Sequence, residues 1–218
     1  MNRREFLIRS LGTMAAFGLA PGLCASTDNK KIIVLDPGHG MGNRKKGVYD
    51  PGVIHGDTYE SHLVIDQAKR IKKLLETDFD VRLTREDEEA ETSLSRRVQI
   101  ANDANADIFV SLHVNGFTEE SAKGARVYHY PGSQNGEKLG RSIQDRLVDN
   151  LIKRVSGFEQ SYEGLKTEDF YVLKHTKMPA VLTEPGFLTN PRDRKYLIEN
   201  PDVIAESIAE GIRGYFGG

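Results

Sequence analysis

The sequence predicts a single α/β domain in which a mostly parallel, twisted sheet of about six strands carries helices on both faces. Short β-branched runs alternate along the chain with segments of helical period, and several of the short runs are apolar throughout. Strands without a polar face are typical of parallel sheets that helices cover on each side. The length of 218 residues supports one such domain after a leader.

The composition excludes several classes of function. Hydrophobic residues make up 38% of the chain and charged residues 28%, as in an ordinary globular protein. A formal net charge of -2 gives no basic excess, so we expect no nucleic-acid partner. The single cysteine, Cys24, lies in the leader, which excludes a thiol nucleophile or a thiolate metal site in the mature chain.

The N-terminus is predicted to be a twin-arginine-type signal peptide. Arg3 and Arg4 precede a modest apolar stretch, 11–23, that Gly and Pro interrupt. An amphipathic first helix is the alternative, but no helical stripe is present. The stretch is shorter than the ~20 residues that span a bilayer. We therefore expect an exported, soluble periplasmic protein with no transmembrane segment in the mature chain. The predicted division is 1–25 signal peptide, 26–30 spacer and 31–218 folded domain.

The predicted strands are short and rich in β-branched or aromatic residues: 31–36, 81–84, 107–113, 125–130, 171–173 and 180–183. The predicted helices show apolar residues at helical spacing, as at Val64, Ala68, Ile71 and Leu75, and cover 60–76, 93–103, 137–155 and 201–215. Because strands and helices alternate, ligands are expected beyond the carboxyl ends of the strands.

Three chemically capable residues fall at those strand ends. His39 follows the first strand, His113 ends the third and Glu184 follows the last. A lone histidine is more often structural than a ligand, but a parallel sheet brings these two strand ends together. Imidazole nitrogens with a carboxylate are a usual donor set for an open catalytic zinc site.

Ordered motifs along the chain carry a family resemblance. They are VLDPGHG at 34–40, DPG at 50–52 with a glutamate at 60, VRLTR at 81–85, LSRR at 94–97, ADIFVSLHVN at 106–115, and PAVLTEPGFLTN at 179–190. Together they resemble the N-acetylmuramoyl-L-alanine amidases of the zinc-dependent type-3 amidase family. The resemblance runs from about Lys31 to the C-terminus.

The resemblance implies one Zn²⁺ per chain held by His39, Glu60 and His113, with Glu184 as the catalytic carboxylate. It also implies that the substrate is peptidoglycan, cut between the lactyl group of N-acetylmuramic acid and the L-alanine of the stem peptide. Taken from the residues alone, Glu60 is better explained as a favourable charge at a helix N-terminus than as a metal ligand.

Other residues have weaker arguments. Asp36 and Asn115 sit where they could orient ligands, or they are turn residues. Gly38 and Gly40 let the backbone bend His39 inward. His175, expected in the loop before the last strand, is a candidate for the cleft rim as a proton donor or substrate contact.

The remaining candidates are interpreted as structural. His55, His62 and His129 have no argument for a role in chemistry and are expected to be surface or structural residues. Arg85 and Arg97 are expected to be buried or packing-related charges.

Regulation and partners are less defined by the sequence. Some division amidases of this family carry a helix that plugs the site until an activator removes it; 147–168, where it would lie, is short here, so we expect no built-in plug. We expect a monomer whose activator protein, where one exists, is not identified by the sequence. Two alternatives stay open: a catalytically dead wall-binding module, and a zinc peptidase or amidase of a different substrate.

Overall fold

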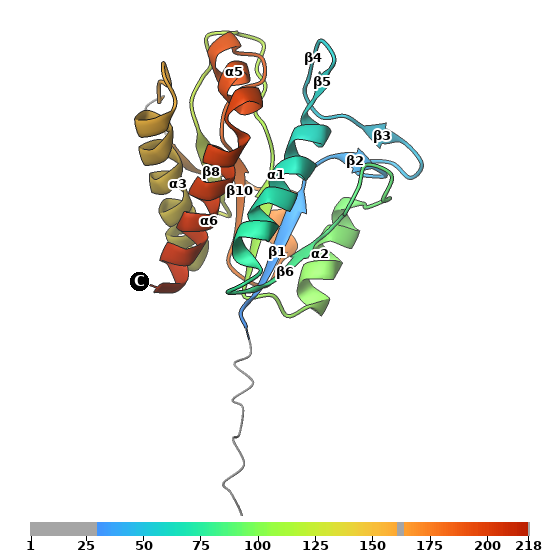
Figure 1. Cartoon of the computed structure of the whole chain (residues 1–218). Coiled ribbons are helices and arrows are strands. Elements are labelled where there is room, and N and C mark those ends of the chain that lie inside the picture. The colour runs from blue at the N-terminus through green and yellow to red at the C-terminus, as the bar shows by residue number, and fades with distance from the viewer. Residues whose placement is uncertain (1–29, 161–163, 218) are drawn as a thin grey trace, which may run out of the picture.

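A six-stranded sheet organises the protein, whose computed structural model describes residues 30–160 and 164–217. Its order is β6-β1-β7-β10-β8-β9 (Figure 1). The strands are β6 (Asp80–Leu83), β1 (Ile32–Pro37), β7 (Ile108–Leu112), β10 (Ala180–Glu184), β8 (Arg126–His129) and β9 (Leu165–Thr167). Only the pairing of β10 with β8 is antiparallel. The mostly parallel sheet that the sequence predicts is therefore confirmed.

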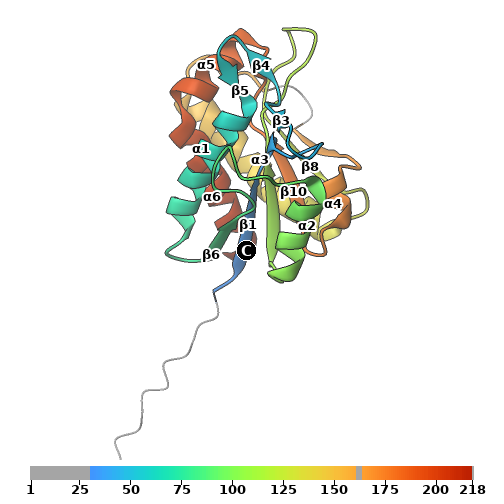
Figure 2. The same ribbon diagram turned by 90° about the vertical axis from the view of Figure 1, so that its right-hand side faces the viewer.

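Helices cover both faces of the sheet, as predicted. One face carries α1 (Glu60–Leu75), α3 (Gln134–Arg154) and α6 (Pro201–Gly217), and the other carries α2 (Leu94–Asp103) and α4 (Tyr171–His175). Figure 2 shows these two layers on either side of the strands. The short helix α5 (Pro191–Glu199) leads from β10 into α6.

Alternating side chains of the central strands pack into two apolar cores, one on each face of the sheet. Ile33 and Leu35 of β1 pack in the core beneath α1, α3 and α6. Val34 of β1 and Phe109 of β7 pack in the core beneath α2 and α4. Each such side chain contributes about 1.5–3 kcal/mol when fully buried. Burial on both faces fixes the strand register, since a slip of one residue would exchange the two cores.

The structure corrects the sixth strand. The segment 171–173 forms part of helix α4 rather than a strand, because Val172 and Leu173 are buried on one side of a single helical region against the second core. The sixth strand is β9, which is only partly buried at the sheet edge and lacks a continuous apolar run. Helix α5 was also not predicted, although Asn190 caps it and Pro191 begins it.

Two small hairpins, also not predicted, lie between β1 and α1. They are formed by β2 (Gly40–Met41) with β3 (Tyr49–Asp50), and by β4 (Ile54–His55) with β5 (Thr58–Tyr59). Two-residue strands are too short to leave a periodic pattern in the sequence. They build a rim beyond the carboxyl end of β1 (Figure 1).

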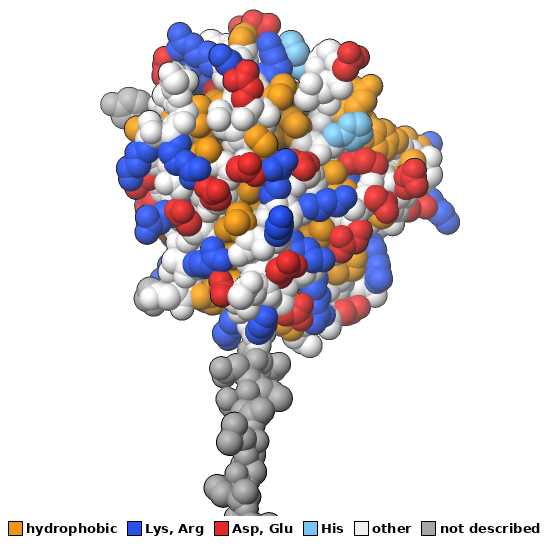
Figure 3. All heavy atoms as spheres, viewed as in Figure 1, with side chains coloured by type: hydrophobic (Ala, Val, Ile, Leu, Met, Phe, Trp, Pro, Cys, Tyr) orange, Lys and Arg blue, Asp and Glu red, His pale blue; other side chains and the backbone are white. Residues whose placement is uncertain are grey.

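Charges of both signs are mixed on the surface of α1 and α6. Arg70 of α1 pairs with Asp66 on its own helix and with Asp202 of α6. Figure 3 shows Lys and Arg interspersed with Asp and Glu over this face, without a continuous basic patch. Exposed pairs of this kind contribute about 0–1 kcal/mol each.

The leader falls outside the described residues. The predicted signal peptide, 1–25, and all of the spacer except Lys30 belong to the part of the chain that the structure does not describe. Within 30–160 and 164–217, no helix combines the length and the apolar character needed to cross a membrane.

Candidate metal centre

His39 is placed at the carboxyl end of β1 by an unusual backbone conformation. Its φ angle is 60°, in the left-handed region that non-glycine residues rarely adopt. The ring then points into the cleft, with Nδ1 3.1 Å from Oδ2 of Asp50 on β3. A carboxylate on the far nitrogen fixes the ring orientation and leaves Nε2 for a ligand.

Glu60 begins helix α1 and turns its carboxylate toward the same point. Oε2 accepts a hydrogen bond from the Val53 backbone N–H (2.9 Å), and Oε1 accepts one from the Val114 backbone N–H (2.9 Å). Oε1 also lies 3.0 Å from His39 Nε2 and 3.0 Å from His113 Nδ1. Burial raises the pKa of Glu60, but the hydrogen bonds and charges of the two histidines outweigh it and lower the pKa.

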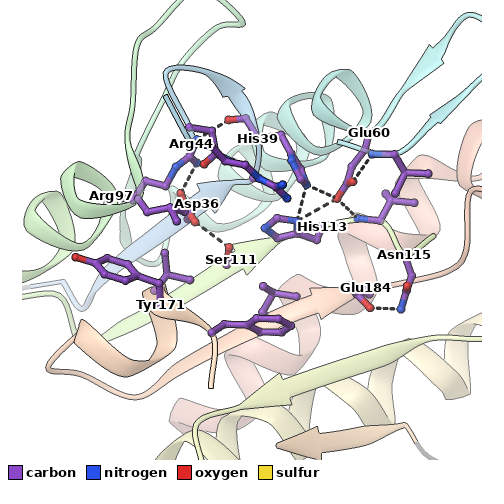
Figure 4. A pocket seen from close by; sticks show the side chains of 18 of the residues that line it. Asp36, His39, Arg44, Glu60, Arg97, Ser111, His113, Asn115, Tyr171 and Glu184 are labelled. Atoms are coloured by element: carbon purple, nitrogen blue, oxygen red, sulfur yellow. Dashed lines mark hydrogen bonds and ion pairs between the residues drawn. The ribbon is translucent and has the colours of Figure 1, made fainter. Parts of the chain in front are cut away.

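His113 follows β7 and completes a cluster of three donors. Its Nδ1 lies 3.1 Å from His39 Nε2 (Figure 4). Its ring packs so closely on Gly38 that a Cβ there would come within 2.3 Å of the His113 Cε1 atom. The loop therefore requires a glycine at position 38 for this side chain to reach the cluster.

The donor set fits a small divalent cation. In a tetrahedral zinc sphere with bonds of about 2.0–2.1 Å, neighbouring ligand atoms are about 3.3 Å apart. The three donors here are pairwise 3.0–3.1 Å apart. The two imidazole rings have too few N–H protons to make each of these three contacts a good hydrogen bond. Nitrogen and oxygen lone pairs therefore point toward one position, as they do around a metal ion. Glu60 also raises the pKa of His39 against the lowering effect of burial, so protons would compete with a cation.

Glu184, the last residue of β10, lines the same cleft. Asn115 donates a side-chain hydrogen bond to its Oε2. Burial and then the negative charge of Glu60 raise the pKa of Glu184 to about 7, against the lowering effects of Arg126, Tyr128 and Asn115. A carboxyl group with a pKa near neutrality can both accept and donate a proton.

The cleft that joins these groups has a volume of about 340 Å³. Its floor includes Asp36 and Ser111, and one wall is apolar, with Leu94, Phe170 and Tyr171 among its residues. The other wall presents the metal-ligand candidates and Glu184 (Figure 4). The cleft can thus place an apolar or sugar-like group beside a polar reaction centre.

The structure shows what the weaker candidates Asn115, Asp36 and His175 contact. Asn115 touches Glu184 rather than a metal ligand, and Asp36 bonds to Arg97, Thr84 and Ser111 rather than to His39. His175 lies at the exposed end of α4, stacked on Tyr171, and does not line the cleft.

The residues interpreted as structural lie as expected. Arg85 and Arg97 are 2% and 1% exposed. His55 and His62 are exposed, and His129 is buried in β8. None of the three lines the cleft.

Sequence reasoning gave no role to Asp50 or to the aromatic wall. Asp50 stands in the quoted DPG motif, two residues before Gly52, where a Cβ would lie 2.5 Å from Glu60 Oε2. That close packing is invisible in the sequence.

None of the described residues of 147–168 lines the cleft, where a plug would have to sit.

Known proteins share this fold and sequence pattern. A model of the family described as N-acetylmuramoyl-L-alanine amidase matches residues 33–214. The N-acetylmuramoyl-L-alanine amidase LytC of Bacillus subtilis is 33% identical over 190 residues, which cover 85% of this chain and 36% of LytC.

Solved structures agree over almost their whole length. The amidase AmiC2 of Nostoc punctiforme superposes with a TM-score of 0.75 at 30% identity, covering 87% of this chain and 98% of that one. An N-acetylmuramoyl-L-alanine amidase from Clostridium difficile 630 gives a TM-score of 0.76 at 29% identity, with coverages of 87% and 98%. Among the curated relatives, the chain spans from 35% to 65% of the length of LytC and three further proteins.

Proposed function

Because the chain belongs to the N-acetylmuramoyl-L-alanine amidase family, we propose that it hydrolyses the amide bond between the N-acetylmuramic acid lactyl group and L-alanine in peptidoglycan. The observation that carries the proposal is the meeting of His39, Glu60 and His113 with Glu184 in one cleft. The three candidate ligands leave room for a fourth position, which hydrolytic sites use for water or substrate.

The cation that this donor set favours is zinc, one per chain. Two imidazole nitrogens and one carboxylate suit zinc better than magnesium or calcium, which prefer all-oxygen spheres. When bound, zinc supplies Lewis acidity that polarises the amide carbonyl and lowers the pKa of water. The protein's part is to hold His39 with Asp50 and to orient the Glu60 carboxylate through the backbone N–H groups of Val53 and Val114.

Glu184 is the proposed general base. It would take a proton from the attacking water and pass it to the departing amine of the stem peptide, because an amide anion is too poor a leaving group. Asn115 holds the carboxylate by a hydrogen bond to Oε2, and Glu184 lines the cleft. The pKa of about 7 supports both halves of this proton transfer.

The place of action is also proposed. Arg3 and Arg4 before the apolar stretch 11–23 favour twin-arginine export to the periplasm, where peptidoglycan is present. We propose that the exported domain is a soluble monomer that meets its substrate through the cleft. The sequence identifies no activator.

The test is digestion of purified peptidoglycan by the exported domain, with free amino termini identified by mass spectrometry. We expect new L-alanine termini with zinc, none with a chelator, and none with Glu184→Ala that retains zinc. Glu89→Ala, at an exposed position, is the matched control. Binding without release would favour the dead wall-binding module, and termini other than L-alanine would favour a peptidase or amidase of another bond.

A further inference from the structure

Three consecutive backbone carbonyls lead into His39, and each accepts hydrogen bonds from a buried guanidinium. Arg85 donates to the carbonyls of Pro37 (3.0 Å) and Gly38 (2.8 Å). Arg97 donates to the carbonyls of Pro37 and His39. The loop that carries His39, the first candidate ligand, is therefore hydrogen-bonded to the two guanidinium groups at three consecutive carbonyls.

The backbone of His39 needs such support. A residue with a side chain is strained at a φ of 60°, and it keeps this conformation only where its surroundings dictate it. The following residue, Gly40, also has a positive φ of 87°. A Cβ at Gly40 would lie 3.0 Å from Cζ of Arg85, so this guanidinium packs directly under the turn.

The same two arginines reach the other two ligand-bearing segments. Arg85 donates to the carbonyl of Ser61 (3.0 Å), the residue after Glu60. Arg97 pairs with Asp36 at 2.7 Å, and Ser111, two residues before His113, donates to the other Asp36 oxygen at 2.8 Å. The network thus joins the β1 loop, the start of α1 and the end of β7.

Stability alone does not explain this arrangement. Burying a guanidinium is costly, and well-packed apolar residues often stabilise a protein as much as a buried ion pair does. A planar cation with five N–H donors is well suited to bridging carbonyls on separate segments. Here those N–H groups donate to backbone carbonyls at and beside His39 and beside Glu60.

We propose that Arg85 and Arg97 are positioning residues that fix the spacing of His39, Glu60 and His113 for metal binding. In this role they act through the backbone carbonyls, although Arg97 also lines the cleft. The inference rests on the metal centre of the proposed function. It adds that the affinity for the metal depends on two side chains outside the ligand set.

The test compares Arg85→Lys and Arg97→Lys with wild type, using Arg82→Lys as the matched control. Lysine keeps the charge, but its three N–H donors sit on one nitrogen and cannot reproduce the planar spread of donors of the guanidinium. Arg82 is exposed on β6, the strand that precedes Arg85, and it pairs with Asp80. Zinc affinity is measured by chelator competition, folding by circular dichroism of the zinc-free protein, and kcat separately from KM.

We expect each lysine variant to bind zinc about 10–100-fold more weakly while the zinc-free protein keeps its fold, and kcat to fall at limiting zinc more than KM changes. Arg82→Lys should match wild type. Wild-type affinity in folded Arg85→Lys and Arg97→Lys would overturn the positioning role and leave the proposed function intact. A wild-type protein without a zinc site would overturn the metal centre, and the positioning role with it.

A milder variant keeps the inference testable should the lysine variants fail to fold. Ser111→Ala removes one hydrogen bond to Asp36 and so loosens the tie to the strand that carries His113. We expect about two- to tenfold weaker zinc binding with an unchanged circular dichroism spectrum. Unchanged zinc affinity in this folded variant would contradict the network.

Discussion

Two acids line the cleft, Glu60 buried and Glu184 half-buried, and their environments differ. Burial raises the pKa of Glu60, but the hydrogen bonds and charges of His113 and His39 lower it overall, and the carboxylate also accepts two backbone hydrogen bonds. Glu184 is hydrogen-bonded by side chains and has no backbone donor among the described residues, so burial and the charge of Glu60 raise its pKa to about 7.

The difference shows how one fold gives two carboxylates separate tasks. A carboxylate saturated with donors stays ionised and suits a permanent ligand. A carboxylate with few donors, beside another negative charge, exchanges its proton near neutral pH. In this protein His113, His39 and the backbone N–H groups of Val53, just before β4, and Val114, just after β7, converge on Glu60 and not on Glu184.

The largest expected effect comes from changing the ligand side of the cleft. Glu60→Gln removes a charge while keeping the side-chain shape. We expect zinc affinity to fall by more than about 100-fold, because even groups that merely support a ligand contribute about 10–100-fold. Activity should fall with it and recover in part at high zinc concentration. Isothermal titration of the zinc-free variant measures the loss; wild-type affinity would remove Glu60 from the ligand set.

Changing Glu184, the proposed base, should instead lower the rate and leave zinc binding almost unchanged. Glu184→Gln should lower kcat by about 10²–10⁴-fold, the usual contribution of a general acid and base. Zinc affinity should stay within about threefold of wild type, because Glu184 is outside the donor cluster. Rate measurements at saturating zinc separate this outcome from metal loss, and retained kcat would transfer the role of base to another group.

The sequence predicted most of the fold because the fold depends on long apolar runs. The buried strands β1, β7 and β10 are apolar runs buried on both faces, and helix α1 is amphipathic with a clear helical period. The missed elements are short or lie at an edge, as with β9 and α4. Tyr171 to Leu173 has strand-forming side chains, but the packing of Val172 and Leu173 against the second core decides for a helix.

For the site, the sequence identified the candidate residues, and the structure shows that they lie together in one cleft. His39, His113 and Glu184 are signalled by their place at strand ends, and Glu60 only by the family resemblance. The part played by Asp50 could not be predicted, because it depends on a hairpin of two-residue strands. The arginine contacts to consecutive carbonyls are likewise invisible without the backbone path of the loop.

A smaller effect is expected on the stability of the zinc-free protein. The raised pKa of Glu184 means that the folded state binds its proton more tightly than the unfolded state does. Stability from this group is therefore present at low pH and is lost as pH rises toward about 7. Glu184→Gln should raise the melting temperature by a few degrees at about pH 8 and by little at about pH 5. A gain of equal size at both pH values would contradict the raised pKa.

The smallest effects concern the apolar wall opposite the two acids. Tyr171 lines the cleft, whereas His175 stacks on the Tyr171 ring at a centroid distance of 4.1 Å without lining it. We expect Tyr171→Ala to lower kcat/KM about tenfold through lost apolar contact with the substrate. His175→Ala should change it by less than about twofold, as is usual for a surface position. A larger loss from His175→Ala than from Tyr171→Ala would show that α4 offers the substrate a polar group rather than an apolar wall.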